Sequence, residues 1–367
     1  MKQLKRILLN FLSIFSLFII NIKIFILKRN KKNRIIFYYY PYPNVTKTQI
    51  AYIEQFLKKF KNYLVFVGIP NFIKYKGQYF TIKQFYLKWI IGADLFVSNI
   101  VCDVLIKKCL KIYIHHDIYD TPLLAKSKED ILARRLSNYD YIFIPSSRCN
   151  DVFQRLFKNY RHKPKIRIIG EYLKLTYLLK RKKIKIYKDN HQVVIAPSGY
   201  HGVPQLSMKN YLPNLIEILL NKNIKVVFRP HPTNINDPIT LKIVNIFKDK
   251  KKFKLDKSLD YFKVYSSSSI MITDYSGTAY TYALLTNNPV IFFSVNEKYI
   301  NKEKYNRLNY FKDRKTIGLI ANNPNRINYY LKKILKNKKK FKKNIIKIKK
   351  KHFSNKRKSL NNLIFAE

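Results

Sequence analysis

The chain has 367 residues, and its 73 Lys and Arg residues against 21 Asp and Glu residues give a formal net charge of +52. Hydrophobic residues make up 47% of the sequence and aromatic residues 15%, which excludes a disordered chain. The length suggests about two domains. The charge favours partners that carry phosphate, namely nucleic acid, an anionic membrane or an anionic substrate, although an AT-rich genome also encourages many lysines.

Common signatures of metal and nucleotide sites are missing. The three cysteines, Cys102, Cys109 and Cys149, form no CxxC pair, which excludes a disulfide framework and a cysteine-rich zinc site. The sequence contains no GxxxxGK[ST], GxGxxG, HExxH, GxSxG or DxD motif. Only eight glycines are present, too few for a glycine-rich phosphate cradle. We therefore expect no metal and no cofactor.

The N-terminal segment 7–22 is uncharged and has basic residues on both sides. No small-residue cleavage site follows it, so a cleavable signal is not expected. It reaches the roughly 20 apolar residues of a membrane span only by running through Lys23 to Leu27. Three interpretations remain open: a helix lying in the membrane interface, a spanning anchor, or a soluble packing helix. The interfacial helix is suggested by polar residues on one half of the helical wheel, namely Asn10, Ser13, Ser16, Asn21 and Lys23.

From residue 35 onward, short apolar runs alternate with segments of helical period, which predicts a parallel sheet covered by helices on both faces. In this first part we expect strands over 35–40, 63–68, 95–98, 111–115, 141–145 and 166–170, and helices over 48–61, 99–110, 128–137 and 148–159.

The polar segment 180–190 is the expected linker, after which the alternation restarts. Strands are expected over 193–196, 225–228, 270–273 and 290–293, and helices over 209–220, 239–247 and 278–286. Two such α/β domains leave a ligand cleft between the carboxyl ends of their strands. The expected division is a membrane-associating segment 1–34, a first Rossmann-like domain 35–180, a second Rossmann-like domain 191–324 and a basic helical tail 325–367.

The tail has no acidic residue between Asn325 and Lys358 and contains the runs KNKKKFKK and KIKKK. A solvated final helix, a second contact with an anionic membrane, and a contact with nucleic acid all fit this composition.

Two strand ends in the second domain carry groups suited to phosphate. After the strand 270–273, Ser276 and Thr278 can cap the following helix, and Gly277 lets a ligand approach the backbone at the positive end of the helix dipole. After the strand 225–228, Arg229 offers a planar fork of donors, and His231, held between two prolines, can donate to a phosphate or to a leaving oxygen. A structural serine cap and a structural histidine are the simpler alternatives.

The first domain contributes the pair His115-His116 where a strand passes into a loop. One of these histidines, with Asp117 or Asp120 nearby, can act as a general base across the cleft. A paired-histidine metal site is the alternative, but no other ligand set has suitable spacing.

These stretches resemble the CDP-glycerol glycerophosphotransferase family of teichoic-acid and capsule polymerases. The resemblance is carried by RPHP at Arg229–Pro232 and DYSGTAY at Asp274–Tyr280. It is supported by APSG at 196–199, IIGEYLKL at 168–175 and the HHD segment at 115–117, and it covers roughly residues 35–320. The family often has His-Gly-Thr-Pro where this chain has His116-Asp117.

The resemblance implies a GT-B architecture of two facing Rossmann-like domains, on the cytoplasmic face of the bacterial inner membrane, and a CDP-alcohol donor. By position, the donor pyrophosphate would be held by Arg229, His231, Ser276, Gly277 and Thr278, and His116 would be the base on the acceptor hydroxyl.

The function expected from residues and resemblance together is the transfer of a polyol phosphate, foremost glycerol phosphate, from a CDP-alcohol to a hydroxyl of a membrane-linked glycan or polymer, with release of CMP. His116 and His231 would be the catalytic residues. The expected partners are the donor, the acceptor and an anionic membrane surface, and not nucleic acid. A GT-B glycosyltransferase that uses a nucleotide sugar, and a non-catalytic basic protein that binds membrane or nucleic acid, are the alternatives.

Overall fold

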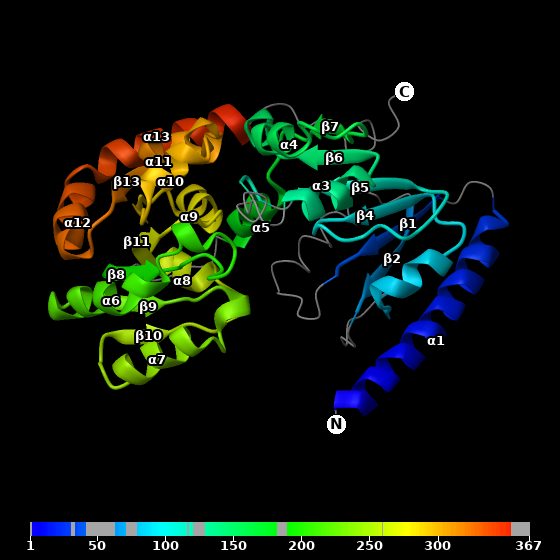
Figure 1. Ribbon diagram of the computed structural model, residues 1–367, viewed down its shortest axis with the longest axis horizontal. Helices are drawn as coiled ribbons and strands as arrows, with labels where there is room; N and C mark the ends of the chain where they lie inside the picture. The colour runs from blue at the N-terminus through cyan, green and yellow to red at the C-terminus, as the bar shows by residue number, and fades with distance from the viewer. Residues whose placement is uncertain are drawn as a thin grey trace.

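The structure is a computed structural model that describes residues 2–30, 34–41, 63–70, 79–115, 117–119, 129–181, 189–258 and 260–353. Two parallel sheets lie side by side along the long axis of the molecule, each with helices around it (Figure 1). The predicted α/β class with two Rossmann-like sheets is confirmed. The helix expected over 48–61 lies outside the described residues.

The first sheet has the strand order β3-β2-β1-β4-β5-β6-β7 within the described part of the chain. Its strands are β1 (Arg34–Tyr39), β2 (Tyr63–Ile69), β3 (Tyr79–Thr81), β4 (Leu95–Ser98), β5 (Leu110–Ile114), β6 (Tyr141–Ile144) and β7 (Lys165–Ile168). The central strands are runs of β-branched and aromatic residues, buried on both faces as parallel strands require. Its helices are α1 (Lys2–Lys28), η1 (Gln84–Trp89), α3 (Glu129–Ser137), η4 (Ser147–Cys149), α4 (Asn150–Leu156) and α5 (Leu173–Arg181).

The second sheet has the order β10-β9-β8-β11-β12-β13. Its strands are β8 (Asp189–Ile195), β9 (Lys225–Phe228), β10 (Phe253–Leu255), β11 (Ser268–Thr273), β12 (Val290–Phe293) and β13 (Gly318–Ala321). Its principal helices are α6 (Leu212–Asn221), α7 (Pro238–Phe247), α8 (Phe262–Ser267), α9 (Thr278–Thr286), α10 (Glu297–Lys302), α11 (Asn309–Ile317), α12 (Ile327–Lys336) and α13 (Lys338–Phe353). Short 3₁₀ turns complete it: η5 (Pro204–Leu206), η6 (Lys209–Tyr211), η7 (Pro232–Asn234), η8 (Tyr305–Arg307) and η9 (Pro324–Arg326).

Each sheet reverses its strand order once, between β1 and β4 in the first sheet and between β8 and β11 in the second. Open α/β sheets bind ligands in the crevice that this reversal leaves at the carboxyl ends of the strands. In the second sheet the crevice lies between the loops that follow Ile195 and Thr273. The topology therefore puts the APSG and DYSGT segments on the two sides of one crevice.

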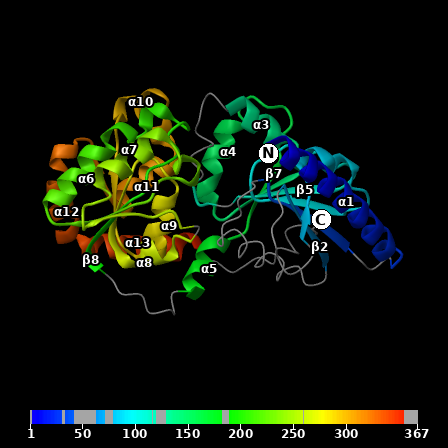
Figure 2. The same cartoon turned by 90° about the horizontal axis from the view of Figure 1, so that it is seen from below.

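One apolar core runs through both domains. It includes Phe37 of the first sheet, Tyr119 of the loop after β5, Tyr280 of α9 and Tyr310 of α11 in a single cluster of buried residues. The opposite faces of the two sheets have separate clusters. Seen from below, helices α4 and α5 of the first domain lie at the junction with the second (Figure 2). The two domains are thus packed against each other, and that packing fixes how their loops meet.

The helix expected over 99–110 is wrong: residues 99–109 connect β4 to β5 without regular structure. The segment carries several β-branched residues, which weaken its helix propensity. Its polar groups also bond elsewhere, because Cys102 Sγ lies 3.3 Å from Tyr139 Oη and Asp103 accepts from Arg135 and Gln84. These tertiary contacts stabilise the connection in an irregular conformation instead of a helix.

The basic tail forms α12 and α13, separated at Asn337. Their apolar residues are buried, including Leu331, Ile334 and Ile345, and α13 packs against α9 and α11. The final helix expected here is thus a pair of helices whose apolar residues pack on the second domain while most of their lysines are exposed. Contact of these lysines with an anionic membrane stays a prediction. Figures 1 and 2 show α13 running along the second domain toward the junction with the first.

Candidate active site

Three loops meet at the carboxyl edge of the second sheet, because β9, β8 and β11 are neighbours. Asp274, directly after β11, is buried and accepts backbone hydrogen bonds from Ser198 (2.9 Å) and Met208 (3.1 Å). Burial raises the pKa of this carboxyl, and the two N–H donors oppose that shift. Tyr275 donates to the Gly199 carbonyl at 3.2 Å. These bonds fasten the loop after β8 to the loop after β11 across the crevice.

His231 stands in the loop after β9, with an exposed side chain beside the loop after β8. A methyl group on Gly199 would lie 3.8 Å from His231 Nδ1. The backbone N–H of Thr233 donates to Nδ1 at 3.3 Å, and the Thr233 hydroxyl lies 2.7 Å from it. Since Nδ1 accepts, we assign the proton of the neutral ring to Nε2. The ring then offers an N–H donor to a ligand.

The protonation of His231 follows from its surroundings. Desolvation by the protein around the strand end lowers its pKa from the ordinary 6.5, and the neighbouring Arg229 charge lowers it further. The ring is therefore neutral at neutral pH, although it is solvent-accessible. The neutral His231 ring can donate a hydrogen bond to a phosphate oxygen without adding a second full positive charge beside that of Arg229.

Arg229 is held by the protein itself. Its guanidinium pairs with Asp256, donates to the Ser258 carbonyl at 2.9 Å and lies 5.6 Å from the Tyr261 ring centre. Only 11% of its side chain is exposed. In this arrangement Arg229 fixes the loop after β10 and acts on His231 through its charge.

Helix α9 begins at the crevice without a side-chain cap. Gly277 occupies the N-cap, and the hydroxyl of Thr278 is paired with Tyr265 at 2.6 Å. The expected caps by Ser276 and Thr278 are therefore wrong; Ser276 is a buried residue whose carbonyl accepts from Tyr310 at 3.3 Å. No side-chain cap satisfies the first N–H groups of α9, and its dipole adds positive potential at this end.

The first domain meets α9 at the same point. A methyl group on Gly277 would lie 2.2 Å from the Tyr119 carbonyl oxygen, so glycine is required for contact with the loop after β5. Asp117 in this loop accepts from Lys174 Nζ at 3.1 Å, from Thr281 at 3.3 Å and from the Tyr172 hydroxyl. Burial opposes the charge on Lys174, but Asp117 holds its pKa well above the ordinary value. Asp117 thus anchors the loop to α5 and α9.

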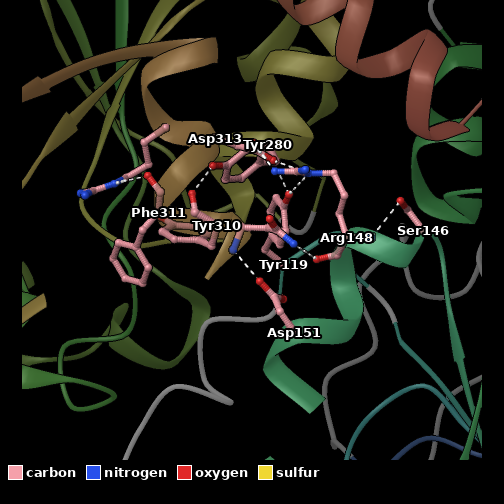
Figure 3. Close-up of polar contacts among 10 residues, drawn as sticks. Tyr119, Ser146, Arg148, Asp151, Tyr280, Tyr310, Phe311 and Asp313 are labelled. Atoms are coloured by element: carbon pink, nitrogen blue, oxygen red, sulfur yellow. Dashed lines mark hydrogen bonds and ion pairs between the residues drawn. The ribbon is translucent and has the colours of Figure 1, made fainter. Parts of the chain in front are cut away.

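A second set of contacts joins the domains next to this loop. Arg148, after β6, pairs with Asp313 of α11, with Nε 2.9 Å from Oδ2, and the Tyr119 hydroxyl donates to the same carboxylate at 2.5 Å. Figure 3 shows these three side chains pointing toward one another. The Tyr119 ring packs edge-on against Tyr280 at 4.6 Å. The loop after β5 is therefore fixed on both sides.

The two candidate base histidines differ in placement. His115 is 1% exposed, and its ring packs edge-on against Phe153 at 5.1 Å, within the aromatic core of the first domain. His116 lies outside the described residues. Because His115 is enclosed, His116 stays the better candidate for the base.

Comparison with known proteins identifies the chain. A sequence model of the CDP-glycerol:poly(glycerophosphate) glycerophosphotransferase family matches residues 21–364. The chain belongs to this family. A relative from Bacillus subtilis (strain 168), the minor teichoic acid biosynthesis protein GgaB, is 29% identical over 136 residues. That aligned region covers 36% of this chain and only 14% of GgaB.

Solved structures support the fold. The wall teichoic acid polymerase TagF superposes with a TM-score of 0.57 at 17% identity, over 90% of this chain and 86% of the TagF chain. UDP-GlcNAc 2-epimerase from Neisseria meningitidis, bound to UDP-GlcNAc, gives a TM-score of 0.57 at 15% identity, over 85% of this chain and 94% of that one. This chain therefore has the GT-B fold implied by its motifs.

Sequence reasoning missed the residues that join the domains, namely Tyr119, Arg148, Lys174, Thr281 and Asp313. Lys174 stands inside the IIGEYLKL segment, so a sequence signal existed for it alone. The other four carry no local motif.

Proposed function

We propose that this protein transfers glycerol phosphate from CDP-glycerol to a hydroxyl group of a membrane-linked polymer or glycan and releases CMP, at the cytoplasmic face of the bacterial inner membrane. Support comes from one juxtaposition: the Nε2–H of His231 and the uncapped start of α9 border the crevice of the second sheet in a member of the glycerophosphotransferase family. Both features suit a pyrophosphate.

In the proposed reaction, His116 removes the proton of the acceptor hydroxyl as its oxygen attacks the β-phosphorus of CDP-glycerol. The bond between the β-phosphorus and the bridging oxygen breaks, and that oxygen leaves with CMP. His231 donates a hydrogen bond from Nε2 to the phosphate oxygens, and the N–H groups at Ser276, Gly277 and Thr278 face the same charge. Burial and the Arg229 charge keep His231 neutral, and Thr233 holds its ring in place. Asp117 holds the loop that carries the base.

The test is CMP release by purified protein in liposomes with a lipid-linked acceptor mixture, comparing CDP-glycerol, CDP-ribitol and a panel of nucleotide sugars. His231→Ala should lower the rate by about 10²–10³, as for loss of one charge-stabilising donor. His201→Ala is the matched control, because this histidine lies in the same domain with a side chain 75% exposed. Equal activity of the two variants would remove His231 from the mechanism. If only a nucleotide sugar is turned over, the proposed glycerophosphate transfer is wrong and the protein is a glycosyltransferase.

A further inference from the structure

The outer side of α13 carries a dense positive charge. The helix has nine lysines among its 16 residues and no Asp or Glu. Residues four apart share one face of a helix, and four exposed lysines follow that spacing. We call them the lysine row: Lys339, Lys343, Lys347 and Lys351.

The lysine row faces away from the protein because the opposite side of α13 is buried. Phe341 is 6% exposed and Ile345 is fully buried, where the helix packs against α9 and α11. Neither α12 nor α13 offers the lysines an acidic partner, since residues 325–358 contain no Asp or Glu. Like charges four residues apart repel each other and destabilise a helix. A partner with regularly spaced negative charges would relieve that repulsion.

The spacing of the lysine row matches the spacing of phosphates in a glycerophosphate chain. Four residues of α-helix rise by about 6 Å. In a chain of glycerol units joined by phosphodiesters, six bonds separate successive phosphorus atoms, P–O–C–C–C–O–P. Six bonds of extended backbone span about 7 Å, as two residues of peptide do. Each phosphate of such a chain can therefore lie beside one lysine of the row.

Helix α13 leads from the far end of the second domain to the domain junction (Figure 1). Near its end, Lys349 donates to the Leu284 carbonyl of α9 at 3.3 Å. Lys349 and Lys350 also line a cavity of about 340 Å³ together with Tyr172 of the first domain. Tyr172 in turn donates to Asp117 in the loop after β5. The lysine row thus ends near the loop that carries the base in the proposed reaction.

We propose that the lysine row binds the phosphodiester backbone of the acceptor polymer, a chain of glycerophosphate units whose end reaches the loop after β5. The chemistry of this polymer rests on the proposed glycerophosphate transfer. Each transferred unit adds one negative charge, so the reaction lengthens the polyanion that the row binds. A long acceptor is therefore held more tightly than a single glycerophosphate unit.

Two other anionic partners fit α13 less well. A helix that lies on a membrane buries an apolar side in the lipid, but α13 exposes no large apolar side chain among those that the structure describes. Single-stranded nucleic acid is held by aromatic side chains on which its bases stack, whereas Phe341 of α13 is buried. A polymer with phosphates and no bases requires neither feature.

Binding is measured by fluorescence anisotropy with full-length protein and fluorescein-labelled glycerophosphate oligomers of one and eight units, without donor. The eight-unit oligomer should bind at least about tenfold more tightly than the single unit, and added salt should weaken its binding. The row variant should bind the eight-unit oligomer at least about tenfold more weakly than the parent, because four exposed ion pairs are lost. This variant combines Lys339→Gln, Lys343→Gln, Lys347→Gln and Lys351→Gln.

The matched control removes four exposed lysines elsewhere in the second domain. It combines Lys222→Gln, Lys242→Gln, Lys248→Gln and Lys254→Gln. Both variants have the same net charge, and glutamine is close to lysine in helix propensity, so the helices should persist. The control should bind the oligomer within about twofold of the parent, because distant exposed charges are screened. Equal weakening in both variants would overturn the assignment, since net charge alone would then explain the binding.

Two other results would assign the lysine row to a different partner and overturn the inference. In the first, the row variant loses binding to phosphatidylglycerol vesicles but keeps its affinity for the eight-unit oligomer, which indicates a membrane contact. In the second, a thymidine oligomer with eight phosphates binds the row at least about tenfold more tightly than the glycerophosphate oligomer does, which indicates a nucleic-acid site.

Turnover separates this inference from the proposed function. CDP-glycerol is supplied with acceptors of one and eight units on the same lipid primer, and kcat/KM for the long acceptor is divided by that for the short one. This ratio should fall at least about tenfold in the row variant and stay unchanged in the control. Transfer with equal ratios in both variants would refute the inference and leave the proposed function intact. Row-dependent binding of the eight-unit oligomer without transfer would support the row and refute the proposed function.

Discussion

Gly277→Ala probes the contact between the start of α9 and the loop after β5, which in the proposed reaction hold the donor and the base. The added methyl group would lie 2.2 Å from the Tyr119 carbonyl oxygen, a backbone atom fixed by the Tyr119–Asp313 hydrogen bond and the Asp117–Lys174 pair. Relief to an ordinary contact of about 3.4 Å requires the loop or α9 to move by about 1 Å. Such overpacking costs about 1–3 kcal/mol. Misplacement of a reacting group by about 1 Å lowers rates by about 10²-fold.

The assay is kcat/KM for CMP release, with the unfolding midpoint as a parallel readout of folding. Gly199→Ala is the matched control, because its methyl group would meet its nearest atoms at 3.8 Å, an ordinary contact, in the same crevice. We expect Gly277→Ala to lose about 10²-fold in kcat/KM while binding of CDP persists, and Gly199→Ala to stay within a few-fold of the parent. Equal activities of the two variants would refute the role of the Tyr119 contact.

Three further expectations follow from buried or shifted charges. Lys174→Met should destabilise the protein by about 3 kcal/mol in chemical denaturation, because it leaves Asp117, whose side chain is only 16% exposed, without its cation. Alanine substitutions at Arg148 and Asp313 should show a coupling free energy of about 1–3 kcal/mol in a double-mutant cycle. His231 should titrate below 6.5 in an NMR titration of the folded protein. The pKa of His231 is lower in the folded protein than in the unfolded chain, so protonation of this ring favours unfolding. Its contribution to the free energy of unfolding is therefore complete above about pH 6.5 and is lost as the pH falls toward the folded pKa.

Each of these has a contradicting result. Lys222→Met removes an exposed lysine and should change the free energy of unfolding by no more than about 0.5 kcal/mol. An equally small change for Lys174→Met would show that the Lys174–Asp117 pair does not stabilise the fold. Additive single substitutions would show that Arg148 and Asp313 do not interact. A titration midpoint of His231 at or above pH 6.5 would show that desolvation and the Arg229 charge do not lower its pKa.

The position of the crevice could be predicted from the sequence, because the motifs that border it follow strands with a clear local apolar pattern. The expected strand 225–228, strand 290–293 and helix 278–286 coincide with β9, β12 and α9. The strands at 270–273 and 193–196 agree within four residues at their starts. In a parallel sheet, strand ends share one edge, so RPHP and DYSGT were expected to lie close together.

The rest depended on tertiary contacts that no local pattern carries. Asp313 and Arg148 are 165 residues apart, and Asp117 and Thr281 are 164 apart. Gly277 was expected to admit a ligand, whereas its missing side chain makes room for Tyr119. The segment 99–109 has a helical spacing of apolar residues, but its polar groups bond across the domain. A single sequence read by itself offers no signal for such pairings.

The most direct test of glycerophosphate transfer follows both halves of the donor. CDP-glycerol is supplied with tritium in the glycerol and ³²P at the β-phosphorus, and a second batch carries ³²P at the α-phosphorus. We predict that tritium and β-³²P enter the acceptor in equal amounts and that α-³²P stays in CMP. We also predict that His231→Ala slows both transfers by about 10²–10³ while His201→Ala does not. Tritium in the acceptor without β-³²P, or no transfer from CDP-glycerol beside turnover of a nucleotide sugar, would contradict the proposed function.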